Sequence, residues 1–175
     1  MAVVRKVELE DLSAIEAAYP ISEGTPGNPH RKAYELHQAG DTTWLVAWEG
    51  DRPCGAVTID WPRSRGHVSR WSDQLGCTEI GGLEVDEDMR GRGIGRALMA
   101  MAEAQVRERG VERLGLEVTA TNPQQDAARA LYTKLGFADA GVGEFISGYT
   151  YWTADGKSHR DEEPHRYLIK RLTPQ

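Results

Sequence analysis

Hydrophobic positions along the first third of the chain repeat with a period of two, then of three, then of two again. Alternation predicts strands at residues 3–7, 42–48 and 54–61, and apolar residues at every third position predict a helix at residues 9–18. Asn28, a good N-cap residue followed by proline, marks the start of a second helix. A turn that contains glycine and aspartate joins the last two strands, as in a β-hairpin. This part of the chain therefore combines two helices with an antiparallel meander.

The second half alternates strand and helix more regularly. The pattern predicts a strand at 78–85, a helix from 94 to a stop at Gly110, a strand at 113–119, a helix at 124–135, and a closing hairpin of 144–152 with 166–172. A strand, a crossover helix and a further strand imply a parallel pair. We therefore expect an α/β fold: a mixed, mostly antiparallel sheet with a central parallel strand pair and helices on both faces. Residues 61–76 are expected to form a long loop.

Size and composition restrict the function. A length of 175 residues fits one domain, and 39% hydrophobic with 27% charged residues is typical of a globular chain. No apolar run approaches the ~18 residues that span a bilayer and no secretion signal opens the chain, so a soluble, cytoplasmic protein is expected. Two cysteines, Cys54 and Cys77, and histidines without ligand spacing predict no metal. A net charge of −6 argues against a nucleic-acid or membrane partner and favours a cationic one.

The turn between the strand at 78–85 and the helix after it carries the clearest chemistry. It reads Arg90-Gly91-Arg92-Gly93-Ile94-Gly95-Arg96. The first N–H groups of a helix lack partners and bind anions such as pyrophosphate, glycines allow close approach, and arginines add positive charge. A Walker loop requires Gly-Lys followed by Ser or Thr, and a dinucleotide loop requires glycine where Arg96 stands, so neither fits. A tight glycine turn with solvated arginines is the alternative.

Two motifs and the element order point to one family. Arg90, Gly93 and Gly95 satisfy Arg-x-x-Gly-x-Gly, which resembles the acyl-CoA pyrophosphate loop of the GNAT N-acetyltransferase superfamily. Residues 128–137, a helix that ends in Leu-Gly-Phe, resemble the second signature of that superfamily, and the order of elements is similar throughout. The resemblance implies a single acetyl-CoA-dependent N-acetyltransferase domain over residues 1–175, and it leaves a homodimer open.

Acyl transfer also needs groups that hold the pantetheine arm and polarise the thioester oxygen. A strand that diverges from its parallel neighbour leaves backbone N–H groups unpaired, and the resemblance implies that Leu83, Glu84 and Val85 supply them. It further implies that the whole turn at residues 90–96 binds the pyrophosphate. These are the expected cofactor-binding residues, and no metal is expected among them.

Tyr132 is the expected general acid. A phenol can protonate a departing thiolate, and the family uses a tyrosine at this position of its second signature. The alternative is a core aromatic residue with a structural hydroxyl. The family often has an asparagine seven residues earlier, where this chain has Gln125, so Asn122 is the nearest candidate for that cofactor contact.

Glu79 is the leading candidate for the general base. It stands where glutamate bases occur in some histone-acetylating members of the family, and a carboxylate among apolar strand residues has a raised pKa. A period of two places Glu79 on one face with Leu83 and Val85, and Glu84 on the other. Glu84 or a chain of waters remain alternatives for the base, and an exposed strand end is the structural alternative for Glu79. Glu117 is expected to be structural.

The expected reaction is direct attack of a primary amine, of a small molecule or a peptide, on acetyl-CoA in a ternary complex. A module that binds acyl-CoA without catalysis and a transferase of another acyl group are the alternatives. The resemblance places the acceptor between residues 21–29 and 153–164. Residues 8–35 and 153–164 together account for the whole net charge, which suggests that they attract a protonated amine. Trp71 is a candidate for the acceptor entrance.

Overall fold

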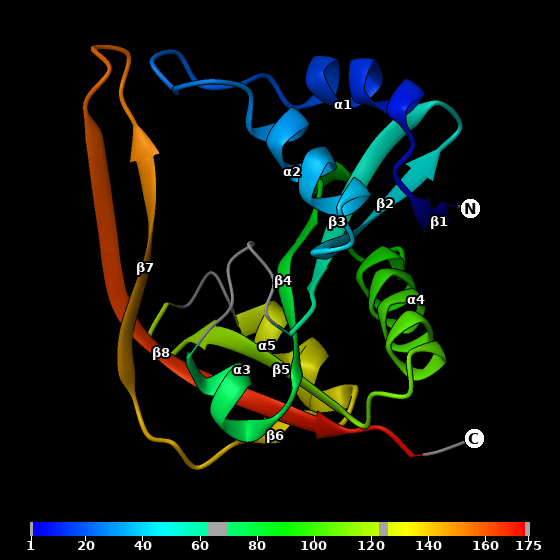
Figure 1. Cartoon of the computed structure of the whole chain (residues 1–175), viewed down its shortest axis with the longest axis vertical. Helices are drawn as coiled ribbons and strands as arrows, with labels where there is room; N and C mark the ends of the chain where they lie inside the picture. The colour runs from blue at the N-terminus through cyan, green and yellow to red at the C-terminus, as the bar shows by residue number, and fades with distance from the viewer. Residues whose placement is uncertain (1, 63–69, 123–125, 174–175) are drawn as a thin grey trace.

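The structure, a computed structural model, describes residues 2–62, 70–122 and 126–173 (Figure 1). The strands are β1 Val3–Lys6, β2 Thr42–Glu49, β3 Arg52–Asp60, β4 Thr78–Val85, β5 Arg113–Thr119, β6 Ala138–Asp139, β7 Phe145–Trp152 and β8 Ser158–Arg171. The helices are α1 Leu12–Ala18, α2 Pro29–Gln38, α3 Arg70–Leu75, α4 Ile94–Glu108 and α5 Asp126–Lys134, with 3-10 turns η1 Leu9–Asp11 and η2 Glu87–Met89.

The strands form one mixed sheet in the order β1-β2-β3-β4-β5-β8-β6, and β7 pairs with β8. The pair β4·β5 is parallel and the other pairs are antiparallel. The parallel pair arises because α4 crosses over from the end of β4 to the start of β5 (Figure 1). The predicted fold class is confirmed.

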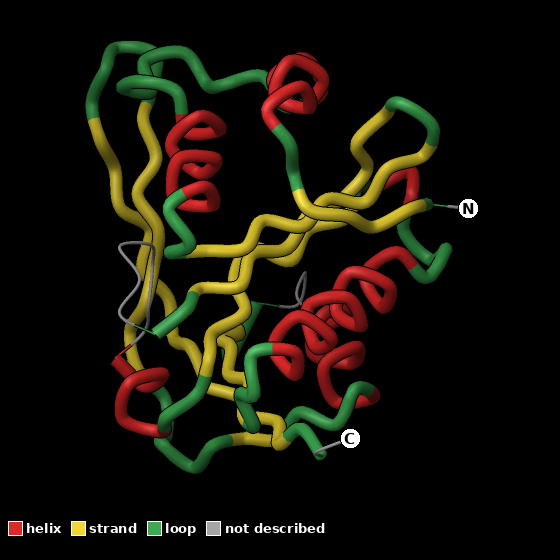
Figure 2. Tube along the Cα trace, turned by 45° about the vertical axis from the view of Figure 1, so that its right-hand side comes forward, coloured by secondary structure: helices red, strands yellow, loops and turns green. Residues whose placement is uncertain are grey.

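Helices cover both faces of the sheet (Figure 2). On one face α1 packs with Trp44, Val46 and Trp48 of β2, and α2 adds partly buried side chains to this cluster. On the other face the apolar stripe of α4 packs against Leu45 and further strands, together with Tyr132 of α5. β2 is buried on both faces, because alternate residues of a strand point to opposite sides. None of the helices in the described parts of the chain is long and apolar enough to cross a membrane.

Local signals in the N-terminal part are confirmed. The side chain of Asn28 accepts a hydrogen bond from the N–H of Arg31, and α2 begins at Pro29. The hairpin of β2 and β3 turns at Gly50, which has a φ of 61°. Glycine is favoured there because other residues rarely adopt a positive φ.

Two predictions about the connecting segments are wrong. The loop expected at residues 61–76 contains α3, whereas residues 63–69 lie outside the described residues. The last strand was expected to begin at Arg166, but β8 begins at Ser158, so most of the loop expected at 153–164 is strand. The hydrophobic pattern misses this part because the strand is stabilised by its ladder to β7, from Phe145↔His165 to Trp152↔Ser158, with largely exposed side chains. The short strand β6 was also not predicted.

Candidate active site

The parallel strands β4 and β5 pair over only two residues and then diverge. Their ladder consists of Thr78↔Leu114 and Glu79↔Gly115, and β4 then continues to Val85 paired with β3. Beyond Glu79 no described strand pairs with the β5-facing edge of β4, so the backbone groups of that edge face a gap. This is the divergence expected beside Leu83, Glu84 and Val85.

The glycine turn leads from the end of β4 into α4. Gly91 and Gly93 have φ values of 76° and 83°, and Gly93 is the N-cap of α4. A Cβ atom at either position would meet no atom within 4 Å, so the turn presents bare backbone to open space. Gly95 has a different role, because a Cβ there would lie 3.3 Å from the side chain of Leu131 in α5. Ile94 anchors the turn in the core with 5% of its surface exposed.

The turn fits a diphosphate group. The first four N–H groups of a helix have no partner within the helix, and the helix dipole is positive there. Arg90 Nε donates a hydrogen bond of 3.1 Å to the carbonyl oxygen of Val85 and so joins the turn to the strand. Arg92 lies 3.7 Å from Glu49, and the exposed Arg96 forms no ion pair with a described residue. Of the three arginines, Arg96 is therefore the one that forms neither an ion pair nor a hydrogen bond with a described residue, and it remains available to an anion.

A β-bulge in β4 overturns the predicted faces of this strand. Thr58 pairs with Gly81 and Ala56 with Glu84, so two residues of β4 oppose one residue of β3. The extra residue lies beside Gly82, whose φ is 55°. The bulge shifts the alternation by one, and Glu84 therefore lies on the same face as Glu79.

Val85 lies on the opposite face of β4 from Glu79. It pairs with Gly55, at which a Cβ atom would lie 3.4 Å from Leu98 of α4. The expectation that Glu79 shares a face with Leu83 and Val85 is therefore wrong, because Leu83 also packs against the core on the α4 side. A pattern with a period of two cannot show where a bulge interrupts it.

Glu79 is buried rather than exposed at a strand end, with 3% of its surface accessible. The hydroxyl of Tyr167 in β8 donates a hydrogen bond of 3.2 Å to Glu79 Oε2. Burial and the charge of Glu79 raise the pKa of Tyr167, which keeps this donor protonated. The exposed alternative for Glu79 is therefore wrong, and the carboxylate is held at the point where β4 and β5 separate.

Asp60 is a second buried carboxylate that the sequence did not single out. It is the last residue of β3, it pairs with Glu79, and 6% of its surface is exposed. Burial raises the pKa of Asp60 to about 7. The available signal was an acid in an otherwise uncharged strand end between Ile59 and Trp61, but only the register of β3 and β4 places it beside Glu79.

Tyr132 lies in α5 with 8% of its surface exposed, and its ring makes an edge contact with Phe137 at 5.9 Å between centroids. Burial raises the pKa of Tyr132 to about 12, so the phenol is protonated at neutral pH but is a weaker acid than an ordinary tyrosine. Its hydroxyl forms no hydrogen bond with a described residue. Asn122 is half-buried between β5 and α5, and Gln125 lies outside the described residues.

The two segments expected to border the acceptor meet in space. A Cβ atom on Gly24 would lie 2.0 Å from the carbonyl oxygen of Thr153 and 3.1 Å from the N–H nitrogen of Gly156, so the α1–α2 connection touches the tip of the β7–β8 hairpin. Figure 1 shows this contact beside the orange end of the hairpin. Trp71 of α3 packs against Phe145 of β7 at 5.7 Å between ring centroids.

Several acids of the two segments that carry the net charge, residues 8–35 and 153–164, form ion pairs. Asp11 forms an ion pair with Arg5, and Glu16 with Arg31. In the hairpin, Arg160 and Lys157 pair with Glu162 and Asp155, respectively. The net charge of the two segments already counts Arg31, Lys157 and Arg160. Of these four pairs, it is Arg5–Asp11 that offsets a further acid.

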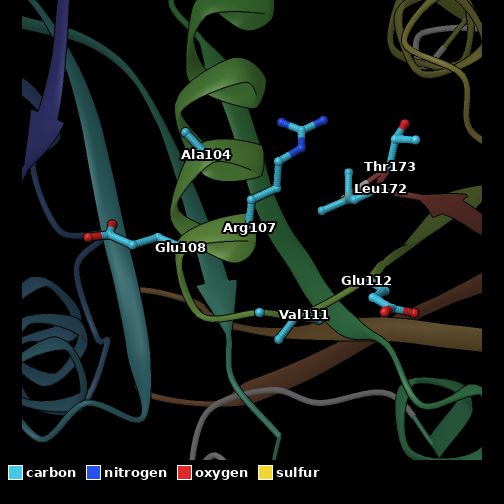
Figure 3. Close-up of a pocket in the computed structure, with 8 residues that line it drawn as sticks. Ala104, Arg107, Glu108, Val111, Glu112, Leu172 and Thr173 are labelled. Carbon is cyan, nitrogen blue, oxygen red and sulfur yellow. The ribbon is translucent and has the colours of Figure 1, made fainter. Parts of the chain in front are cut away.

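A separate cavity lies away from these residues. A volume of about 600 Å³ opens between the C-terminal half of α4 and the end of β8, where Arg107, Val111, Glu112 and Leu172 line it (Figure 3). This is the end of α4 opposite to the glycine turn, and none of the expected site residues lines the cavity. The described residues also include no group of three His, Cys, Asp or Glu side chains that could hold a metal ion.

The chain is similar to known acetyltransferases. A model of the acetyltransferase (GNAT) family matches residues 9–137. The chain is 41% identical to the ribosomal protein bS18 alanine N-acetyltransferase of Escherichia coli K12 over 75 residues, which is 43% of this chain and 46% of that protein. It is 42% identical to the streptothricin acetyltransferase of Streptomyces lavendulae over 74 residues, 42% of this chain and 36% of that protein. The matches thus span less than half of these relatives.

The fold is shared with solved structures over nearly the whole chain. A GNAT superfamily phosphinothricin acetyltransferase from Sinorhizobium meliloti, in complex with AcCoA, superposes with a TM-score of 0.65. The superposition covers 98% of this chain and 88% of the other at 19% sequence identity, which shows a common fold.

Proposed function

Because the chain belongs to the acetyltransferase (GNAT) family, we propose that it transfers an acetyl group from acetyl-CoA to a primary amine. The observation that carries the proposal is the divergence of β4 and β5 after Glu79, followed directly by an open glycine turn. The first feature can hold an extended chain by backbone hydrogen bonds, and the second can hold a pyrophosphate. Acetyl-CoA has both parts in this order, and it is bound in the related structure from Sinorhizobium meliloti.

On this proposal the cofactor is held mainly by backbone groups. Leu83, Glu84 and Val85 offer the open edge of β4 to the pantetheine arm, and the turn at residues 90–96 surrounds the pyrophosphate. Asn122, in the segment before α5, is a further proposed contact. Bound acetyl-CoA supplies an activated acyl group and a thiolate leaving group, so the chain itself needs to orient the amine and move protons.

Glu79 is the proposed proton acceptor and Tyr132 the proposed donor. A buried carboxylate at the inner end of the gap can remove a proton from an amine that attacks the thioester. Tyr132 is protonated at neutral pH and can pass its proton to sulfur as the C–S bond breaks. Glu79 projects from the face of the sheet away from α4, whereas Tyr132 packs on the α4 side, so the two groups can serve opposite sides of the same thioester carbonyl.

The proposal is tested by measuring thiol release from acetyl-CoA with a panel of amines. The panel contains polyamines, aminoglycosides, amino acids and peptides, including a peptide with N-terminal alanine because the E. coli relative is named for that group. We expect turnover with at least one class and a product that gains one acetyl group by mass spectrometry. Binding of acetyl-CoA without turnover on any amine would instead favour a non-catalytic acyl-CoA sensor, and turnover only with other acyl-CoA esters would favour a different acyl group.

A further inference from the structure

Two buried carboxylates lie side by side where β4 leaves β5. Asp60 of β3 pairs directly with Glu79 of β4, so both side chains project from the same face of the sheet. Cβ atoms of residues directly opposite each other on antiparallel strands are roughly 5 Å apart. Glu79 is also the last residue of β4 that pairs with β5. The two carboxylates therefore stand at the inner end of the gap between these strands.

The two carboxylates differ in their surroundings. Tyr167 donates a hydrogen bond to Glu79, whereas none of the described residues donates one to Asp60. The hydroxyl group nearest along the strand, that of Thr58, donates to the carbonyl oxygen of Gly81 instead. With 6% of its surface exposed, Asp60 is thus a buried acid for which the described part of the chain provides no donor.

A buried anion without a donor or a cation is unfavourable. This is why burial raises the pKa of Asp60 to about 7, which leaves the group divided between acid and anion near neutral pH. The titratable groups on or beside this face include Glu79 and Glu84 of β4, Cys77 just before β4, Tyr167 of β8, Arg113 and Glu117 of β5, and His37 of α2, which contacts the N–H of Trp44. Arg113 is the described cation of this set, but it acts on Cys77 and donates a hydrogen bond to the carbonyl oxygen of Leu75 rather than to Asp60, so a positively charged ligand is what would stabilise the anion.

Residue 81 places no side chain beside Asp60. Gly81 lies on the same face, and a Cβ atom there would be 3.1 Å from Asp60 Oδ2 and 3.0 Å from Thr58 Oγ1. Such a contact is tighter than an ordinary van der Waals contact, so a methyl group would crowd the carboxylate. Packing beside Asp60 is therefore tight, so a cation that binds its carboxylate has to be compact.

Resting on the acetyl transfer proposed above, we infer that Asp60 and Glu79 together bind the acceptor as its ammonium cation and take the first proton from it. The R–NH₃⁺ group donates hydrogen bonds to both carboxylates. One proton moves from nitrogen to the carboxylate pair, and the freed lone pair then forms the C–N bond. As the C–S bond breaks, Tyr132 gives its proton to the departing sulfur and the second nitrogen proton returns to the Tyr132 oxygen, so the products are the amide, the CoA thiol and one proton that the carboxylate pair releases to solvent. The substrate class is an aliphatic amine that is protonated in solution, and hydroxyl groups and weakly basic aryl amines are excluded.

The first experiment does not depend on turnover. Ethylammonium chloride is the probe, and tetramethylammonium chloride, which has the charge but no N–H donor, is its control at the same ionic strength. We expect ethylammonium to raise the Tm of the protein more than tetramethylammonium does, and we expect this difference to disappear in Asp60→Asn. Equal effects on the wild type, or an unchanged difference in the variant, would overturn the inference whether or not an acceptor is found.

A pH series checks that the variant removed the intended group. In the folded protein Asp60 keeps its proton to a higher pH than in the unfolded chain, so wild-type stability falls as pH rises from about 4 to about 7. Asp60→Asn removes this loss. The Tm of the variant minus that of the wild type should therefore become more positive between about pH 4 and about pH 7. A difference that does not change with pH would show that Asp60 carries no such charge and would overturn the inference.

Once an acceptor is known, kinetics give the second test. Asp60→Asn should raise the acceptor KM about tenfold or more, shift the acidic limb of the kcat/KM profile, and leave the Kd of acetyl-CoA unchanged. Gly81→Ala keeps the carboxylate of Asp60 but crowds it, so this variant should raise the acceptor KM less than Asp60→Asn does. Asp11→Asn is the matched control, because Asp11 is also a buried aspartate but pairs with Arg5. An acceptor KM that responds equally to Asp60→Asn and Asp11→Asn would refute the assignment.

Discussion

The proposed cofactor side and the proposed acceptor side of this site consist of different kinds of chemical group. On the cofactor side, the edge of β4 and the turn at residues 90–96 are contiguous in sequence and offer backbone groups. On the acceptor side, Asp60, Glu79 and Tyr167 come from three strands and offer side chains. Backbone recognition of a shared cosubstrate tolerates sequence change, whereas side-chain recognition sets the identity of one substrate. Substitutions should therefore separate cofactor affinity from acceptor affinity.

The largest effect is expected from Gly93→Asp on the cofactor side. The substitution places a carboxylate against the proposed pyrophosphate position, and the Kd of acetyl-CoA should rise about 100-fold or more, as measured by calorimetry. Gly110→Asp is the control, because Gly110 also has a positive φ and open space but lies at the other end of α4. If both variants bound acetyl-CoA as the wild type does, the turn would not be the phosphate site.

Tyr132→Phe should change neither the affinity for acetyl-CoA nor the affinity for the acceptor. It should lower kcat about 100-fold, because it removes the proposed proton donor. The ring contact with Phe137 remains, so the fold and the Kd of acetyl-CoA should not change. The measurement is steady-state kinetics with acetyl-CoA in excess. A kcat within about twofold of the wild type would remove Tyr132 from the mechanism.

Gly24→Ala tests the acceptor side. A Cβ atom would collide with the carbonyl oxygen of Thr153, so the α1–α2 connection should move away from the hairpin tip and the acceptor KM should rise about tenfold. Gly27→Ala is the matched control, since Gly27 has a φ of 73° and a Cβ atom there would meet no atom within 4 Å. Both positions carry a similar backbone strain of roughly 1–2 kcal/mol, so only the collision differs. A loss of acetyl-CoA affinity in Gly24→Ala would break the separation between the two sides.

The smallest effect is expected from the exposed arginines of the turn. Arg96→Ala should raise the Kd of acetyl-CoA about threefold at low salt and less at high salt, because exposed charge contacts are worth roughly 0.2–1 kcal/mol. Arg31→Ala, an exposed arginine of α2 paired with Glu16, should have no effect. A large loss in Arg96→Ala would mean that side chains rather than backbone dominate the cofactor side.

Elements that depend on interactions between neighbouring residues could be predicted from the sequence alone. The bounds of β4 and β5 are confirmed to the residue, the cap of α2 by Asn28 is confirmed, and α4 begins at the predicted turn. Such features follow from hydrophobic periodicity, from capping side chains and from glycine at positive φ, all of which act within a few residues. The family resemblance depended on the same local motifs.

The residues that are distant in sequence but lie together in the candidate site could be identified from the three-dimensional structure and not from the sequence. The bulge beside Gly82 placed Glu84 on the face of Glu79, and the β3–β4 register brought Asp60 beside Glu79. The extension of β8 to Ser158 brought the hairpin tip to the α1–α2 connection. Strand register and bulges are set by the packing of the whole sheet, and a shift of one residue exchanges the two faces of a strand. For that reason the cofactor side is readable from the chain, whereas the acceptor side requires the fold.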